Sequence, residues 1–392
     1  MSQELINRSA DLLRLRDEGY DVEVREGALI VGSVPYVNST RDVKFGKLVS
    51  ELTLAGNVTA TPSTHVVFFA GDHPCNKDGS QISAIQNGTG INRFEGGILV
   101  NHSFSCKPNG GYKDYYDKMT TYTAIISSPA ESIDPNVTPK VFPVVTADSE
   151  ESVFNYIDTA SSRAGIYAIT KRLEVGRVAV VGLGGTGSYV LDLIAKTPVK
   201  EIHIFDGDQF SQHNAFRSPG APSVEELQLK PSKVTHFQEL YSKMRRHIIA
   251  HLYFIHAQNV GELLEMDFVF LCIDGGSAKR LIFESLEAGG KPFVDVGMGV
   301  YEVEHKLGGV LRVTTMTPGG SQDRARKSVS LVEDVVKDEY SRNIQIADLN
   351  ALNAALAVIR WKRLLGFYVD FEREHYSTYT IDGNMLTNEV QV

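Results

Sequence analysis

Residue types that bind phosphate, ribose and divalent cations occur in a fixed order between residues 182 and 274. In chain order they are Gly182, Gly184, Gly185, Gly187, Asp206, Asp208, Asn214, Arg217, Lys233 and Asp274. Glycine lets the backbone approach phosphate closely, because no Cβ intervenes. Arginine and lysine neutralise phosphate charge, and a carboxylate at the end of a strand is a common Mg²⁺ ligand. This order therefore predicts a site for a nucleoside triphosphate and a magnesium ion.

A strand, a turn, a helix and a second strand are expected to position the first of these residues. Residues 178–181 form an apolar run typical of a buried strand, and the glycine turn follows directly. A helix over residues 188–196 and a strand over residues 202–205 come next, and Asp206 ends that strand. In nucleotide-binding βαβ units, the helix N-terminus meets phosphate and the acid after the second strand binds ribose. We therefore expect Asp206 to bind ribose hydroxyls.

The residues after Asp206 distinguish two classes of nucleotide-binding protein. An NAD-binding oxidoreductase needs one ribose acid at this point and no cation beside it. Here Asn214 and Arg217 occupy the next loop, and an amide with a guanidinium suits a triphosphate better. The oxidoreductase is therefore the alternative interpretation. Purely structural roles are also open, since Asn214 can cap a turn and Asp274 can cap a helix that starts near residue 277.

The pattern after residue 217 predicts a doubly wound, mostly parallel Rossmann-like sheet in an α/β domain. Apolar strands are expected at residues 251–258, 267–273 and 292–300, with helices at 234–248 and 276–290 between them. Later segments are predicted as an antiparallel hairpin at 301–318, a polar crossover at 319–328 and a final strand at 377–382. A helix at residues 346–366 is expected to pack on the sheet or across a dimer through Ile346, Leu349, Leu352, Leu356 and Ile359.

The glycine turn and the residues that follow it resemble the motifs of the ThiF-type adenylating superfamily. This superfamily includes the ubiquitin-activating enzymes and the activators of sulfur-carrier proteins. The matching motifs are Gly182-Leu-Gly-Gly-Thr-Gly187, Asp206-x-Asp208, Asn214-x-x-Arg217, Lys233 and Cys272-x-Asp274. The resemblance spans residues 155 to 385, and it departs from the family at Ser218, where glutamine is frequent. It implies an ATP-dependent adenylyltransferase that acts as a homodimer.

The resemblance also implies a role for each matching residue. The residues that would hold ATP are Asp206, Asn214, Arg217 and Lys233. Asp274 would hold Mg²⁺, and Arg163, which lies just before the first strand, would reach the phosphates bound by the partner subunit. The implied substrate is the C-terminal carboxylate of a ubiquitin-like or sulfur-carrier protein, which attacks the α-phosphate and releases pyrophosphate. Relatives that adenylate a peptide or a tRNA base remain alternatives.

The fate of the activated acyl group depends on where the cysteines lie. Thioester-forming members of the superfamily carry the acceptor cysteine after the sheet, but no cysteine follows Cys272 here. Cys272 itself lies within an apolar strand, where core packing is the expected role. The acyl group would then pass to a sulfur donor, to a cysteine near the N-terminus or to a separate conjugating enzyme.

Residues 1–150 are expected to form a smaller α+β domain before the adenylation domain at 151–392. A strand followed by His-Pro-Cys-Asn-Lys-Asp-Gly at residues 73–79 is similar to a segment of ubiquitin-conjugating enzymes. That resemblance implies a thioester cysteine downstream, with Cys106 as the first candidate and Cys75 as the second. The alternative is an accessory or carrier-binding domain with inert thiols.

Two long polar stretches interrupt the elements of the first half of the chain. Residues 73–97 contain no clear periodic pattern and predict a long loop. Residues 138–152 contain two prolines followed by polar and acidic residues, which is typical of a linker.

Composition and charge exclude several functional classes. The 392 residues are 42% hydrophobic and 22% charged, which suits a globular chain with two domains. No apolar run approaches about 18 residues, and the N-terminal segment indicates an amphipathic helix instead of a signal peptide. The net charge of −9 argues against extensive nucleic-acid contacts. Only 3 cysteines are present, which favours a reducing, cytoplasmic setting and excludes a paired C-x-x-C zinc site.

Overall fold

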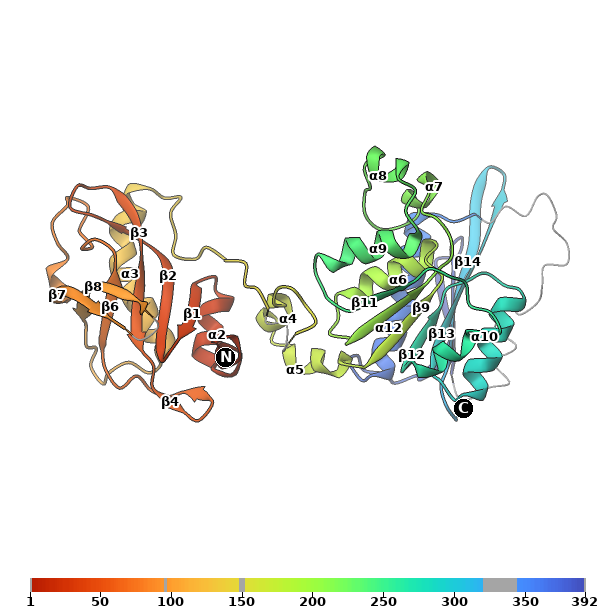
Figure 1. Ribbon diagram of the computed structural model, residues 1–392, viewed down its shortest axis with the longest axis horizontal. Coiled ribbons are helices and arrows are strands. Elements are labelled where there is room, and N and C mark those ends of the chain that lie inside the picture. The colour runs from red at the N-terminus through yellow and green to blue at the C-terminus, as the bar shows by residue number, and fades with distance from the viewer. Residues whose placement is uncertain (1, 95–96, 148–151, 320–343, 391–392) are drawn as a thin grey trace. The chain divides into compact units, whose positions relative to one another are not determined.

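The computed structural model describes residues 2–94, 97–147, 152–319 and 344–390. The chain forms two compact units, Met1–Val145 and Thr146–Val392 (Figure 1). Each unit mixes helices with a sheet and has its own hydrophobic core. None of the described helices is both long enough and apolar enough to cross a membrane.

The C-terminal unit is built on an 8-stranded sheet with the order β11-β10-β9-β12-β13-β14-β15-β16. Its strands are β9 (Arg177–Val181), β10 (Glu201–Phe205), β11 (Ile248–His251), β12 (Phe268–Leu271), β13 (Phe293–Val303), β14 (Lys306–Met316), β15 (Glu374–Thr380) and β16 (Met385–Val390). Strands β11 to β13 in this order are parallel, and β14 to β16 add antiparallel neighbours. The predicted mostly parallel sheet and the hairpin after it are confirmed.

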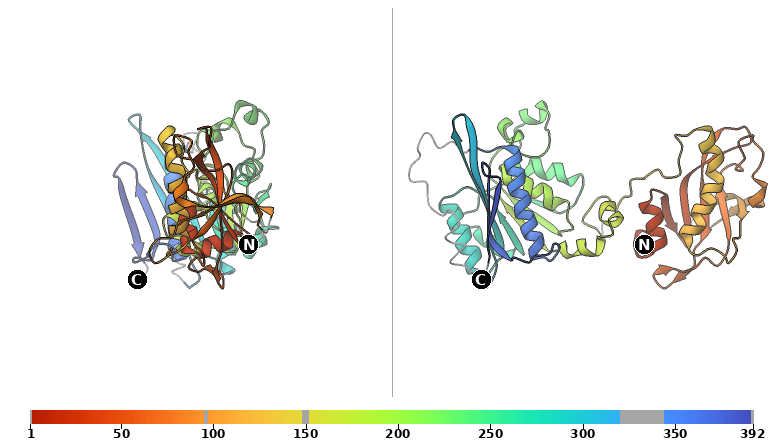
Figure 2. Two further views of the ribbon diagram at one scale, coloured as in Figure 1. Left: turned by 90° about the vertical axis from the view of Figure 1, so that its left-hand side faces the viewer. Right: turned by 180° about the vertical axis from the view of Figure 1, so that it is seen from behind.

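Helices cover both faces of this sheet, so the predicted double winding is also confirmed (Figures 1 and 2). The helices are α4 (Thr159–Arg163), α5 (Tyr167–Thr170), η3 (Lys171–Leu173), α6 (Gly185–Ala195), α7 (Gln212–Ala215), α8 (Val224–Gln228), α9 (Lys233–Ser242), η4 (Val260–Glu265), α10 (Ser277–Ala288) and α12 (Ala347–Leu364). Residues of α6, α9 and α12 share a core with Val178 and Val180 of β9. Residues of α10 and η4 share a second core with Ala179 and Val181. Successive strand residues point to opposite faces, so one short strand contributes to both cores.

Helix α12 packs on the sheet as predicted, but through a different face. Leu352 and Ile359, which the apolar pattern places in the core, are 36% and 38% exposed. The residues that α12 buries include Asn350, Ala354, Ala357 and Trp361. Alanines let the helix come close to α6 and β13, and polar side chains in the contact find partners there. Of the predicted apolar positions, Leu356 packs against the core, so only part of that face meets the sheet, and its packing across a dimer stays a prediction.

The strand expected at residues 251–258 was also placed incorrectly. The strand is β11, which ends at His251 where the prediction began. Residues 252–258 form a connection that leads into η4. Pairing with β10 extends only over the shorter segment Ile248–His251, so the aromatic residues that follow it lie outside the strand.

The N-terminal unit is an α+β fold built on a 6-stranded antiparallel sheet with the order β1-β2-β3-β6-β8-β7. Its strands are β1 (Asp21–Arg25), β2 (Ala28–Val37), β3 (Val43–Glu51), β6 (Val66–Ala70), β7 (Gln86–Arg93) and β8 (Leu99–Ser105), with a separate pair, β4 (Leu54–Ala55) and β5 (Val58–Thr59). Its helices are α1 (Ser2–Arg8), α2 (Ala10–Asp17), η1 (Ser83–Ile85) and α3 (Tyr115–Ile133). Apolar residues of α2 and α3 pack with β2 in one core.

The long loop predicted at residues 73–97 is in part regular. It contains η1 and the strand β7, which pairs with β8 through two register shifts. Bulges and glycines hide the alternation that normally indicates a strand, which explains the missed assignment. The predicted polar crossover at residues 319–328 lies largely outside the described residues. The predicted linker at 138–152 lies partly outside them.

Candidate functional site

A cleft of about 1040 Å³ opens at the carboxyl ends of β9, β10 and β12. The predicted site residues that line it are Gly182, Gly184, Gly185, Asp206, Asp208, Arg217, Lys233 and Asp274. They come from the turns after three neighbouring strands and from the start of α9. Crevices at this edge of an open parallel sheet are the usual place for a ligand.

The glycines of the first turn are needed for different steric reasons. Gly182 has φ of 90°, and a Cβ there would lie 2.7 Å from the carbonyl oxygen of Cys272. A Cβ on Gly187 would overlap the carbonyl oxygen of Gly182, so this glycine lets α6 start against the end of β9. Gly184 has no atom within 4 Å of the Cβ position and leaves space at the cleft wall. Two glycines therefore shape the turn, while the third leaves room for a ligand.

Asp206 ties the glycine turn to the loop after β10. Its Oδ2 accepts a hydrogen bond from the backbone N–H of Leu183 at 2.7 Å, and its Oδ1 accepts one from Asp208 N–H at 2.8 Å. The residue is only 5% exposed. Asp208 lines the same cleft with a side chain that is 56% exposed. The carboxylate that is most open to a ligand is therefore that of Asp208.

Lys233 is held in place by both acids. Its Nζ lies 2.6 Å from Asp208 Oδ2 and 3.4 Å from Asp206 Oδ2. The residue begins α9, whose first turn is capped by Ser232 through Thr235 N–H at 3.1 Å. A capped helix start and two carboxylates therefore fix a buried cation at the cleft wall.

Arg217 lines the cleft and has a donor that is not used within the described residues. Its Nε is buried and has no hydrogen-bond partner among the described residues. Asn214 holds the loop before it, because Asn214 Oδ1 accepts from Ser211 N–H at 2.8 Å and Asn214 O accepts from Arg217 N–H at 3.1 Å. A buried donor without a partner is costly, so an anionic ligand at Arg217 would relieve it. Asn214 is 4% exposed and serves as the cap that the alternative interpretation foresaw.

Asp274 lies on an exposed turn after β12 and lines the cleft. The N-cap of α10 is Gly276, so Asp274 is not the capping residue of that helix. Within the described part of the chain, no group of three or more His, Cys, Asp or Glu side chains is arranged to hold a metal ion. Mg²⁺ needs no such cage, since it binds through one or two carboxylates together with water and substrate phosphates. An exposed carboxylate beside a phosphate-binding turn fits that requirement.

Four predicted site residues do not line the cleft: Gly187 and Asn214 lie in the elements next to it, and Arg163 and Cys106 lie elsewhere in the chain. Arg163 ends α4 and is not among the described residues that line the cleft. Cys106 follows β8 in the N-terminal unit and is half-buried. Its carbonyl oxygen accepts from Tyr112 OH at 2.8 Å, and its N–H donates to Tyr122 OH. Burial raises the pKa of the thiols of Cys75 and Cys272, which favours packing roles for both.

Asn350 is a site residue that the sequence patterns did not reveal. It is fully buried on α12. Its Oδ1 accepts from Thr186 Oγ1 at 3.0 Å, and its Nδ2 donates to the carbonyl oxygen of Arg217 at 3.3 Å. Asn350 therefore joins the first turn of α6 to the loop that carries Arg217. The available signal was the pair of asparagines, Asn350 and Asn353, among the alanines and leucines of this helix.

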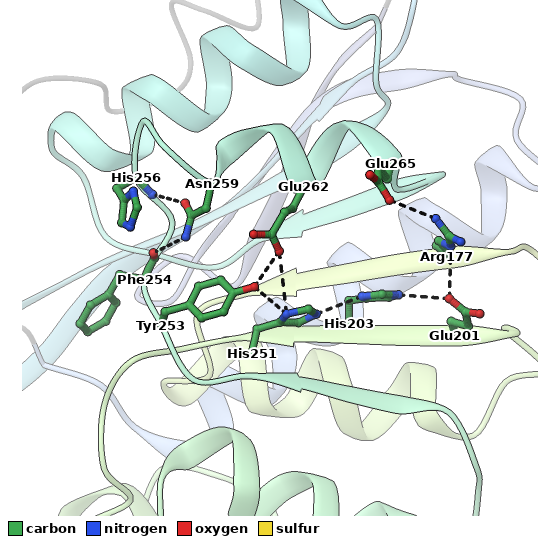
Figure 3. A network of polar contacts seen from close by, with 10 residues as sticks. All are labelled: Arg177, Glu201, His203, His251, Tyr253, Phe254, His256, Asn259, Glu262 and Glu265. Carbon is green, nitrogen blue, oxygen red and sulfur yellow. Dashed lines mark hydrogen bonds and ion pairs between the residues drawn. The ribbon is translucent and has the colours of Figure 1, made fainter.

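Aromatic residues form the wall of the cleft near Asp208. Phe254 is 59% exposed, and its ring covers Gly207, where a Cβ would lie 2.6 Å away. Asn259 Nδ2 holds the backbone by donating to Phe254 O at 3.0 Å (Figure 3). The ring of Phe205 also lines the cleft and stacks on His251 with centroids 4.1 Å apart. This wall is apolar and flat, which suits a nucleobase.

His251, which stacks on Phe205, belongs to a polar network that Figure 3 shows. His251 contacts His203 at 3.1 Å and Tyr253 OH at 2.8 Å, and Tyr253 OH donates to Glu262 at 2.6 Å. Burial lowers the pKa of His251, and the neighbouring His203 acts in the same direction while Glu262 opposes it. A neutral imidazole is therefore favoured beneath Phe205.

Two family models match the chain, one in each half. Residues 159–333 match the family model described as the ThiF family. Residues 10–159 match a model described as a domain of unknown function, DUF6791. No curated protein sequence matches the chain at a significant level.

Several solved structures are similar at low identity. PaaA shows 14% identity and a TM-score of 0.45 over 57% of this chain and 76% of its own. MccB from E. coli with ATP shows 15% identity and a TM-score of 0.45 over 59% of this chain and 70% of its own. The microcin C7 biosynthetic enzyme MccB with N-formylated MccA shows 15% identity and a TM-score of 0.45 over 78% and 96%.

Proposed function

We propose that this chain, which contains a ThiF family domain at residues 159–333, is an ATP-dependent adenylyltransferase. The proposed substrate is the C-terminal carboxylate of a ubiquitin-like or sulfur-carrier protein. One observation carries the proposal: a single cleft is lined by the glycine turn, by cationic side chains that include Arg217 and Lys233, and by the carboxylate of Asp274. A dehydrogenase site has no need of Arg217 and Lys233 beside its ribose acid.

In the proposed reaction, a carboxylate oxygen attacks the α-phosphorus of ATP, and the bond to the β-phosphate oxygen breaks. Arg217 and Lys233 are proposed to neutralise charge that develops on the phosphates, which is the main work of phosphoryl-type transfer sites. Asp208, as the more exposed acid, is proposed to bind ribose, and Asp206 to hold the turn on which ATP lies. Asp274 would hold Mg²⁺, which neutralises phosphate oxygens when bound. The products are an acyl adenylate and pyrophosphate.

Isotope exchange between ATP and pyrophosphate tests this function, because it reports formation of the adenylate alone. We expect exchange that requires an added carrier protein with an intact C-terminus, and loss of at least about a hundredfold in Asp274→Ala. Glu284→Ala removes the same charge from the exposed side of α10 and should leave exchange unchanged. Absence of exchange with carrier proteins, peptides and tRNA, together with NAD(H) binding tighter than ATP binding, would establish the oxidoreductase instead.

The acceptor of the acyl group is proposed to be Cys106 of this chain. It is the only half-buried cysteine of the N-terminal unit among the described residues, whereas Cys75 is fully buried. In full-length Cys106→Ser, exchange should remain at the wild-type level, because Cys106 takes no part in forming the adenylate. A carrier-linked thioester, detected as a band that a reducing agent removes, should disappear. A thioester that persists in the variant would assign the acceptor elsewhere.

The proposed enzyme is a homodimer in the cytoplasm. In this proposal Arg163 reaches the ATP bound by the partner subunit. That role accords with its place at the end of α4, away from the cleft of its own chain.

A further inference from the structure

A second charged cluster, formed by Lys279, Asp295 and Arg312, lies on α10, β13 and β14, and β9 and β12 separate β13 from β10, after which Asp206 and Asp208 follow. Lys279 and Arg312 line the cleft, and Asp295 lies fully buried between them. Lys279 Nζ is 2.6 Å from Asp295 Oδ1, and Arg312 Nη2 is 3.3 Å from Asp295 Oδ2. Two cations share one anion, so the cluster carries an excess positive charge into the cleft. The nucleotide-binding residues described above do not use it.

The two cations differ in how much of their hydrogen-bonding capacity is already used. Lys279 is 2% exposed and also donates to the carbonyl oxygen of Ile273 at 3.2 Å. The side chain of Arg312 is 19% exposed, and its Nε has no hydrogen-bond partner among the described residues. Arginine offers five N–H donors in a planar fork, of which Asp295 takes only one here. Arg312 is therefore the member of the cluster with donors left for a ligand.

The strands beneath Arg312 leave a bare surface. In the register of β13 and β14, Gly297 is opposite Arg312 and Gly299 is opposite Val310. A side chain at Gly297 would collide with the guanidinium, so this glycine lets Arg312 lie across β13. Gly299 has no atom within 4 Å of its Cβ position and lines the cleft. An extended chain could lie on this glycine floor with its end at Arg312.

Adenylation brings a carboxylate against a phosphate, and two anions repel each other unless a cation lies beside them. Arg217 and Lys233 stand on the ribose side of the cleft with the glycine turn. A further cation beside the attacking group would offset that repulsion, and one that is held by a buried acid is already oriented before the substrate arrives.

We propose that Arg312 binds the carboxylate of the acyl substrate, that Asp295 and Lys279 position its guanidinium, and that Gly297 and Gly299 form the floor for an extended acyl chain. This inference rests on the proposed adenylation. Arg312 is accordingly a binding residue for the substrate, and Asp295 acts only through it.

The test compares two adenosine compounds by calorimetry on the full-length chain. One is 5′-O-sulfamoyladenosine, which carries no acyl group, and the other is its N-(acetylglycyl) derivative, which imitates the acyl adenylate and whose carbonyl oxygen stands for the substrate carboxylate oxygen that stays on the acyl group. We expect wild type to bind the acylated compound more tightly. Arg312→Gln should lose about tenfold or more of that increment, as expected for a charge-assisted hydrogen bond, and should bind the parent compound with unchanged affinity. Arg280→Gln, an exposed arginine on α10, is the matched control and should retain the increment.

Gly299→Leu provides an independent variant, because it fills the floor without removing a charge. It should also lose the increment and keep parent binding, which shows that the fold and the nucleotide site are intact. An Arg312→Gln protein that keeps the full increment would overturn the assignment. If it no longer binds the parent compound, Gly299→Leu decides, and an unchanged increment there overturns the assignment. Failure of wild type to bind either compound would instead contradict the proposed adenylation itself.

Discussion

At the scale of single residues, the two acids after β10 differ in the contacts they already make. Asp206, which is predicted to bind ribose, accepts backbone N–H groups at both of its oxygens, from Leu183 and Asp208. Asp208 is more exposed and holds Lys233 at 2.6 Å. A buried carboxylate with charge-assisted bonds to amides is a structural tie, and the neighbour open to the cleft remains available to a ligand.

Asparagine variants of the two acids separate these roles. In Asp206→Asn, one carboxylate oxygen becomes an NH₂ donor that faces a backbone N–H, and we expect a loss of about 2–3 kcal/mol in unfolding free energy. In Asp208→Asn, the loss should be below about 1 kcal/mol, while ATP affinity falls about tenfold. Urea unfolding and calorimetry with ATP measure the two quantities. Equal destabilisation by both variants would contradict the structural role of Asp206.

At the scale of elements, the cleft depends on how closely α6 and α12 approach the end of β9. Gly187 brings α6 against the carbonyl oxygen of Gly182, and a side chain at Gly185 would collide with Asn350 of α12. Asn350 in turn holds Thr186 and the carbonyl oxygen of Arg217. The glycine turn therefore serves close packing of α6 and α12, in addition to the phosphate binding proposed for it.

Two alanine variants distinguish packing from binding within this turn. Gly187→Ala places a Cβ against the backbone oxygen of Gly182, which cannot move aside, and should cost about 2 kcal/mol or more in unfolding free energy. Gly184→Ala meets no neighbour and should change stability by less than about 1 kcal/mol, but its methyl enters the ligand space and should weaken ATP binding about tenfold or more. Thermal unfolding with and without ATP checks both. Wild-type ATP affinity in Gly184→Ala would argue against phosphate binding at this turn.

At the scale of the whole molecule, each of the two units has its own core, so the unfolding free energy of each unit depends on the residues of that unit. The core of the N-terminal unit contains Lys118 of α3, which is fully buried. Its Nζ donates to Ser50 Oγ at 2.9 Å and to Thr64 O at 2.8 Å. Burial lowers the pKa of Lys118 to about 8 from an ordinary 10.5, with Glu51 opposing the shift.

This buried lysine gives the N-terminal unit a pH-dependent stability. Above pH 8 the folded chain releases the Lys118 proton while the unfolded chain keeps it up to pH 10.5, so unfolding free energy rises with pH in that window. Between pH 8 and 9.5 the gain should be about 1.5 kcal/mol relative to Lys118→Met, which lacks the proton. Urea unfolding of both proteins at the two pH values measures it. If the difference in unfolding free energy between wild type and Lys118→Met is the same at both pH values, Lys118 is not desolvated in the folded chain.

Patterns along the chain were sufficient for the α/β class, the glycine turn and the order of polar residues that line the cleft. The reason is local. A buried parallel strand needs a continuous apolar run, and a tight turn that leaves room for phosphate needs glycine, so the segment Val178 to Gly187 is predictable from its own residues. The antiparallel hairpin after β12 was legible for the same reason, because alternation has a fixed period of two.

Only the tertiary structure decided which of these residues face the ligand. The separate roles of Asp206 and Asp208 depend on which backbone amides lie near each carboxylate. The role of Asn350 depends on a hydrogen bond to Arg217, 133 positions away in the sequence, and that of Arg312 on a hydrogen bond to Asp295, 17 positions away. The buried face of α12 likewise depends on how closely an alanine-rich surface can approach α6. Hydrophobicity alone favours the leucine and isoleucine positions of this helix over the alanines that it buries. Burial, close approach and shared hydrogen bonds are properties of pairs of distant segments, so no local pattern specifies them.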